Sequence, residues 1–195
     1  AITDTGNLFG ALEFSETLAG KGIQPIIGCT LKVDFADSGR DQANRPGTPP
    51  KLPSIALLAK DEGGYANLMR LTSRAWLDHG ATSEPHVDLT LLEACGEGLI
   101  CLTGGPDGPI DTLLAEGQPP RARQRLEALH RLFGDRLYVE LPRHGTEAEQ
   151  LAEPTLVDFA YALGIPLVAT NQPFFAARDD FAAHDALLCI ADGEV

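Results

Sequence analysis

The chain has 195 residues, of which 44% are hydrophobic and 22% are charged, a length and composition that fit one globular domain with a single core. It carries 15 basic and 28 acidic residues, a net charge of −13. Because non-specific nucleic-acid binding depends on Lys and Arg, this charge argues against direct DNA binding. No apolar run approaches the roughly 20 residues that a membrane-spanning helix needs.

The chain contains four cysteines, which are Cys29, Cys95, Cys101 and Cys189. No two of them form a Cys-x-x-Cys pair. Most of them lie within apolar runs, where a free thiol behaves as a small hydrophobic side chain. This pattern fits a reducing compartment and argues against a disulfide framework. We therefore expect a cytoplasmic protein.

Short apolar runs alternate with amphipathic stretches along the chain. In chain order we expect strands at residues 1–3, 25–33, 53–59, 98–103, 136–141 and 166–170. Between them we expect helices from Asn7 to Gly20 or Gly22, at 65–76, at 113–114, at 126–133, at 156–163 and at 183–190. Asn7 is the expected N-cap of the first helix, and Gly134 and Gly164 are the expected ends of two later ones.

The alternation of strands and helices predicts an α/β fold with a largely parallel sheet. Unequal helices favour a distorted barrel or a doubly wound sheet over a regular eight-fold barrel. Residues 35–53 contain several prolines and few apolar residues, which predicts a loop within the domain. The sequence shows no boundary of a second domain, so we predict that residues 1–195 form a single domain.

Polar residues follow the strands, where parallel α/β folds place their chemistry. Asp4, Asn7 and Asn171 are the side chains expected on the rim of a pocket. The alternative is purely structural, because turns between strands and helices need Asn, Asp and Gly whatever the function.

Seven ordered segments carry a resemblance to a known family. They read AITDTGNLFGALEF, GIQPIIGC, GYANLMRLTSRAWL, GLICLTGGPDGPI, RLYVELPRHG, IPLVATNQPFF and AAHDALLCI. Together they resemble the PHP (polymerase and histidinol phosphatase) domain of bacterial DNA polymerase III alpha subunits, of the replicative and alphaproteobacterial type. The resemblance implies a distorted seven-stranded, TIM-like β/α barrel. It also implies that the first strand, which carries a His-x-His motif, precedes Ala1.

Active members of this family hold a cluster of metal ions with His, Asp, Glu and sometimes Cys. Such ions activate a water molecule for attack on a phosphodiester. Carried onto this chain, the ligand positions fall on Thr5, Thr30, Gly105, His144, Gln172 and Phe174. Of these only His144 is a good transition-metal ligand. The resemblance therefore predicts a degenerate site, with no metal and no catalytic residue in this chain. His144 is expected to form hydrogen bonds within the old pocket.

Three functions remain open. The first is a non-catalytic structural and docking domain, which the resemblance connects with the proofreading exonuclease subunit and the polymerase core. The second is an active metal-dependent phosphoesterase, either a 3′–5′ exonuclease or a pyrophosphatase. The third is a sugar-metabolising α/β barrel, against which the ordered family segments argue. Under the first two, the full-length protein is a DNA-directed DNA polymerase that uses Mg²⁺ in another domain.

Overall fold

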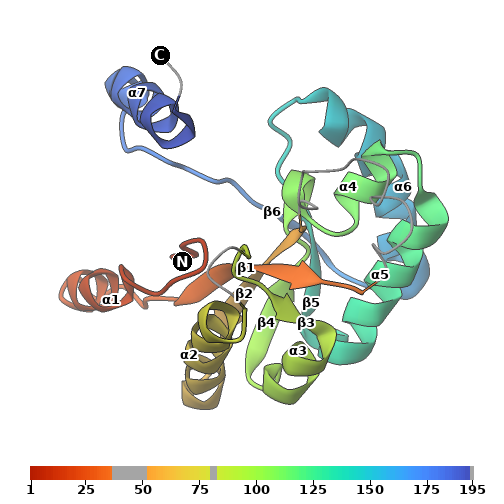
Figure 1. Cartoon of the computed structure of the whole chain (residues 1–195), viewed down its shortest axis with the longest axis horizontal. Helices are drawn as coiled ribbons and strands as arrows, with labels where there is room; N and C mark the ends of the chain where they lie inside the picture. The colour runs from red at the N-terminus through yellow and green to blue at the C-terminus, as the bar shows by residue number, and fades with distance from the viewer. Residues whose placement is uncertain (37–51, 80–82, 194–195) are drawn as a thin grey trace.

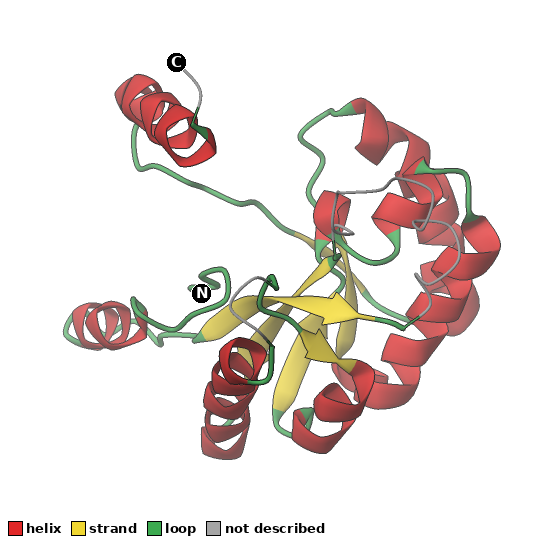
Figure 2. Cartoon of the chain, in the orientation of Figure 1, coloured by secondary structure: helices red, strands yellow, loops and turns green. Residues whose placement is uncertain are grey.

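The structure is a computed structural model, and it describes residues 1–36, 52–79 and 83–193. The predicted proline-rich loop at 35–53 lies almost entirely outside the described residues. Within the described part, no helix is long and apolar enough to cross a membrane. The fold is a mixed α/β arrangement, which confirms the predicted class (Figures 1 and 2).

Six strands form one sheet in the order β3-β1-β2-β4-β5-β6. Their bounds are β1 (Gly28–Asp34), β2 (Ser54–Ala59), β3 (Val87–Asp88), β4 (Leu99–Leu102), β5 (Leu137–Leu141) and β6 (Leu167–Ala169). The pairs β1–β3, β4–β5 and β5–β6 are parallel, whereas β2 is antiparallel to both β1 and β4. The expected strands are confirmed except for the first. The sheet is less uniformly parallel than predicted, because β1 and β2 adjoin in sequence and pair directly.

The α-helices lie where the sequence predicted them, with one addition, α3. They are α1 (Ala11–Ala19), α2 (Glu62–Leu77), α3 (Leu89–Cys95), α4 (Asp111–Ala115), α5 (Pro119–Phe133), α6 (Glu147–Leu163) and α7 (Phe181–Asp192). Three short 3₁₀ turns, η1 (Gly105–Asp107), η2 (Gly134–Arg136) and η3 (Arg178–Asp180), complete the described elements. Gly134 and Gly164 end α5 and α6, as expected, and both have positive φ angles.

The N-terminal residues follow β1 without forming a full strand. Ile2 and Thr5 make isolated parallel bridges to Ile27 and Thr30. The prediction that Asn7 caps the first helix is wrong, because α1 begins at Ala11 after Gly10. The side chain of Asn7 accepts a hydrogen bond from the Phe9 N–H instead, at 3.0 Å. This short-range bond satisfies Asn7 locally, one turn before the helix starts.

The core lies between the sheet and the helices that cover it. α2 packs against β1, β2 and β4, while α5 and α6 pack on the β4–β5 side and α4 packs against α6. The largest fully buried side chains include Phe133, Leu31, Ile55 and Leu126. Burial of such apolar side chains is the main favourable contribution to folding.

α7 stands away from the sheet at the end of an extended segment (Figure 1). Its side chains are largely apolar, and Phe181, Leu187, Leu188 and Ile190 are each at least 50% exposed. A helix that is apolar on most sides is normally buried. The helix therefore carries a surface suited to packing against another element.

Candidate functional site

The predicted site residues fall into two groups on the described structure. The first group surrounds the start of β1. Thr5 and Thr30 form a parallel bridge, the Thr30 N–H donates to the Asp4 carbonyl at 3.0 Å, and the Asn7 amide donates to the Thr5 carbonyl at 3.0 Å. Backbone pairing of residues 2–5 with β1 thus brings Asp4, Thr5, Asn7 and Thr30 together.

The second group lies at the carboxyl ends of β4, β5 and β6. Gly105 follows β4 in η1, and a Cβ at that position would lie 3.4 Å from the Pro142 side chain. His144 follows β5, and its Nε2 lies 3.2 Å from Oδ1 of Asn171, which follows β6. Since these strands are parallel, their ends meet at one edge of the sheet.

Two predicted positions do not join either group. Gln172 is exposed, and the ring of Phe174 lies 5.5 Å from the ring of His184 on α7. No hydrogen bond within residues 1–36, 52–79 and 83–193 connects the first group with the second. The hydrogen bonds and ring contacts of the described residues therefore do not by themselves join the six positions inferred from the resemblance into one site.

His144 is held on both sides of its ring. Its Nδ1 lies 3.0 Å from Oε1 of Glu149, and its Nε2 faces Asn171. The hydrogen bond to Glu149, followed by that to Asn171, raises the pKa of His144 above its ordinary value. Both ring nitrogens thus have protein partners, and His144 could bind a metal ion only by giving up one of them.

Glu149 is positioned by the start of α6. Its other oxygen, Oε2, accepts hydrogen bonds from the backbone N–H groups of Gly145 and Thr146, at 2.8 and 3.0 Å. Thr146 caps the helix and accepts from the Glu149 N–H, which completes a capping box. Burial alone would raise the pKa of Glu149, but these hydrogen bonds and that of His144 lower it overall.

Sequence reasoning missed two further buried carboxylates, Glu140 on β5 and Asp111 at the start of α4. Oε2 of Glu140 accepts from the Gly104 N–H at 2.5 Å, and the Thr170 side chain also bonds to this carboxylate. Burial raises the pKa of Glu140 in spite of these bonds. The signal in the sequence was a single acidic residue inside the apolar run at 137–141.

Asp111 is buried and has an unpartnered oxygen, Oδ2. Burial, and then the negative charges of Glu140 and Glu149, raise its pKa to about 7. Such a group is expensive to keep ionised, because the hydrogen bond from its own backbone N–H compensates only in part for its loss of water.

The donors at this edge do not fit a metal cluster. Within the described residues, no group of three or more His, Cys, Asp or Glu side chains could hold a metal ion. Burial raises the pKa of Cys29, beside the first group, to about 11, so its thiol stays protonated near neutral pH. No catalytic step through a metal can be derived from these side chains.

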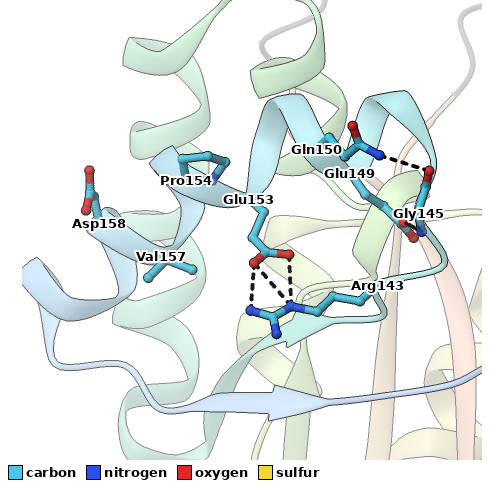
Figure 3. Close-up of a pocket in the computed structure, with 8 residues that line it drawn as sticks. All are labelled: Arg143, Gly145, Glu149, Gln150, Glu153, Pro154, Val157 and Asp158. Carbon is cyan, nitrogen blue, oxygen red and sulfur yellow. Dashed lines mark hydrogen bonds and ion pairs between the residues drawn. The ribbon is translucent and has the colours of Figure 1, made fainter.

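A groove of about 590 Å³ opens beside this edge (Figure 3). It runs along α6 and the turn after β5, and its lining residues are Arg143, Gly145, Glu149, Gln150, Glu153, Pro154, Val157 and Asp158. Arg143 makes a two-pronged pair with Glu153 across it, with its Nη2 2.7 Å from Oε1. We call this feature the α6 groove.

Comparison with known proteins gives consistent results. The PHP domain family matches residues 1–144. The chain is 46% identical over 192 residues to the DNA polymerase III subunit alpha of Caulobacter vibrioides, and 40% identical over 191 residues to that of Treponema pallidum. It is 37% identical over 192 residues to that of Rickettsia bellii. These alignments cover 97–98% of this chain but only 15–16% of each relative.

Proposed function

Because this chain belongs to the PHP domain family, and its curated relatives are mostly alphaproteobacterial DNA polymerase III alpha subunits, we propose that it is a catalytically inactive structural and docking domain of such a subunit. The observation that carries the proposal is the state of His144. It is the one good ligand left among the six inherited positions, and both of its ring nitrogens face protein partners.

The other five positions support an inactive site. Threonine and glutamine are neutral, weak ligands, while glycine and phenylalanine supply no ligand atom at all. An upstream His-x-His strand would add imidazoles but no carboxylates. A cluster of divalent ions needs several anionic ligands to offset its charge, so such a strand would not restore it.

Two features support a longer β/α barrel around this domain. β6 ends the described sheet on one side, and residues 2–5 lie alongside β1 near the other. We infer from membership of the family that a further parallel strand lies between these edges and closes a seven-stranded barrel.

The proposed docking role also rests on the similarity of this chain to DNA polymerase III alpha subunits. The proposed partners are the proofreading exonuclease subunit and the polymerase core of the same polypeptide. The charge of −13 supports a protein partner and disfavours DNA, because acidic surfaces repel phosphates. In this proposal the full-length protein is a cytoplasmic DNA-directed DNA polymerase whose Mg²⁺ ions lie outside this chain.

A second function has one observation in its favour. Two buried carboxylates, Glu140 and Glu149, lie close enough to raise the pKa of a third, Asp111, and Glu149 also bonds to His144. If they could rearrange around ions, the domain would be a metal-dependent phosphoesterase, either a 3′–5′ exonuclease or a pyrophosphatase. Against this, Glu140 and Glu149 are already occupied by backbone N–H groups.

The test is metal content and phosphodiester hydrolysis of the domain, extended upstream to include the family's first strand. After incubation with Zn²⁺ or Mn²⁺ and removal of loose ions, we expect less than about one ion per chain and no hydrolysis. An active PHP domain treated in the same way is the positive control. Two or three ions per chain, with hydrolysis lost in His144→Ala, would establish the phosphoesterase instead.

A further inference from the structure

The α6 groove has the dimensions of a short peptide site. Gln150, Glu153, Pro154, Val157 and Asp158 follow the helical spacing that places them on one face of α6. Eight helical steps of 1.5 Å make this face about 12 Å long, which matches three or four residues of extended chain at about 3.3 Å each. The groove is therefore long enough for a short extended segment.

The middle of the groove is apolar and carries an unusual hydrogen-bond acceptor. Pro154 and Val157 supply the apolar surface (Figure 3). Because Pro154 lies inside the helix and has no N–H, it cannot donate the usual i to i−4 bond to the Gln150 carbonyl. The groove thus offers apolar contact next to a backbone oxygen that lacks its normal helical donor.

The groove carries charges of both signs, because Arg143 lines it together with acidic residues of α6. α6 contains four acidic residues, Glu147, Glu149, Glu153 and Asp158, and no Lys or Arg. Two of them already have cationic partners, since Glu149 bonds to His144 and Glu153 pairs with Arg143. Asp158 is exposed at the far end of the groove, so a ligand that carries a positive charge there would gain a favourable interaction.

We propose that the α6 groove receives a short extended segment of a partner protein, in which a Lys or Arg meets Asp158 and a neighbouring apolar side chain covers Pro154 and Val157. This inference rests on the proposed docking function and names the surface and the chemistry that serve it. A backbone N–H of the segment would reach the Gln150 carbonyl.

Charge also decides between the possible occupants. A nucleic acid would bring phosphates to an acidic helix, which is unfavourable. A second copy of this chain would bring a net charge of −13 toward another of −13, and like charges oppose association. A segment with basic and apolar side chains complements the groove in both respects.

The experiment measures binding of the full-length alpha subunit to the proofreading exonuclease subunit of the same organism by biolayer interferometry. Two variants alter the groove, Asp158→Lys and Val157→Glu. Glu93→Lys on α3 makes the same charge change on an exposed residue away from the groove and is the matched control. Thermal unfolding of each variant verifies that it is folded.

We expect Asp158→Lys and Val157→Glu to weaken binding at least about fivefold, and Glu93→Lys to change it less than about twofold. If the wild-type protein binds and both groove variants bind equally well, the groove proposal is overturned while the docking function stands. If the wild-type protein does not bind, the docking function itself is wrong. Loss of self-association in Asp158→Lys, with exonuclease binding unchanged, would assign the groove to a second copy and also overturn the proposal.

Discussion

Nδ1 of His144 lies 3.0 Å from Oε1 of Glu149, and this contact joins the turn after β5 to the first turn of α6. His144 and Glu149 lie five positions apart in the sequence. The same imidazole reaches Asn171 after β6, so one side chain ties together two neighbouring strand ends. His144 thus serves as a structural link between these two turns.

The first prediction concerns the titration of His144. Glu149→Gln should lower the pKa of His144, because the hydrogen bond to Glu149 is the largest cause of its elevation. Asn171→Ala should lower it less. The pKa of His144 is higher in the folded than in the unfolded state. The hydrogen bond between His144 and Glu149 therefore stabilises the protein most below the ordinary pKa of histidine. This stabilisation is lost as the pH rises through the folded-state pKa of His144. Glutamine can also complete a capping box at the start of α6. Glu149→Gln therefore removes the negative charge of residue 149 without removing the helix cap.

NMR titration of the histidine ring signals measures this effect directly. The wild-type protein and the two variants are compared under the same conditions. An unchanged His144 titration in Glu149→Gln would show that the carboxylate does not hold the imidazole in solution.

The second prediction concerns Asp111. Its pKa of about 7 in the folded protein, compared with an ordinary value of 3.8, means that the folded state holds its proton longer than the unfolded state does. The resulting stability is fully present below the ordinary value and is lost as the pH rises toward about 7. Asp111→Asn cannot ionise, so it should not suffer this loss. The free energy of unfolding of Asp111→Asn, relative to that of the wild-type protein, should increase by roughly 2 to 3 kcal/mol between about pH 5 and about pH 8.

Urea unfolding of the wild-type protein and Asp111→Asn at several pH values provides the measurement. Asp107→Asn, four residues earlier in η1, is a control for the loss of one acidic group nearby. Equal pH dependence of the wild-type protein and Asp111→Asn would mean that Asp111 has a solvated or partnered carboxylate in solution.

The third prediction concerns the glycine-rich turn after β4. Gly104 has φ +87°, and a Cβ at this position would lie 1.9 Å from the Ser54 carbonyl oxygen. Gly104→Ala should therefore destabilise the domain by more than about 3 kcal/mol, since the neighbouring atom is backbone and cannot move aside easily. Gly117 has a similar φ of +73°, but a Cβ at this position would have no atom within 4 Å. Gly117→Ala should therefore lower the free energy of unfolding by only about 1 to 2 kcal/mol.

Chemical denaturation separates these two effects, because the two variants share the backbone strain and differ in the clash. Equal losses in both would show that the positive φ angle alone explains the requirement for glycine. In that case the close approach of β2 to the turn would contribute nothing.

The fourth prediction reverses the loss of the metal site. In a domain extended upstream by the His-x-His strand, the combination Thr5→His, Thr30→Glu, Gln172→Asp and Phe174→His should increase tightly bound Zn²⁺ to more than about one ion per chain. The imidazole of His144 would have to leave its present partners to take part. Adding His144→Ala to the same combination should reduce the bound Zn²⁺.

Metal content by atomic emission, after dialysis, measures the outcome. Failure of the combination to bind Zn²⁺ would mean that the replaced side chains alone do not explain the lost site. The backbone around Gly105 and Asn171 would then have to differ from that of a metal-binding PHP domain.

The sequence by itself determined the strand–helix order, most of the strands and the family. These features depend on local patterns, such as apolar runs and glycines at helix ends, and on ordered motifs. The sequence also predicted that His144 is the one good ligand left among the family's metal-binding positions, and this stays a prediction. The cap formed by Thr146 and Glu149, and its contact with His144, were not predicted from the sequence.

Only the tertiary structure decided which carboxylates lie near one another and which one bonds to His144. Asp111, Glu140 and Glu149 come from different elements, and only the packing of α4 and α6 and the position of β5 bring them together. Burial raises the pKa values of Asp111 and Glu140, and the charges of Glu140 and Glu149 raise that of Asp111 further; no local pattern encodes these effects. The antiparallel placement of β2 was likewise a matter of long-range pairing, because an apolar run has the same sequence signature in either direction.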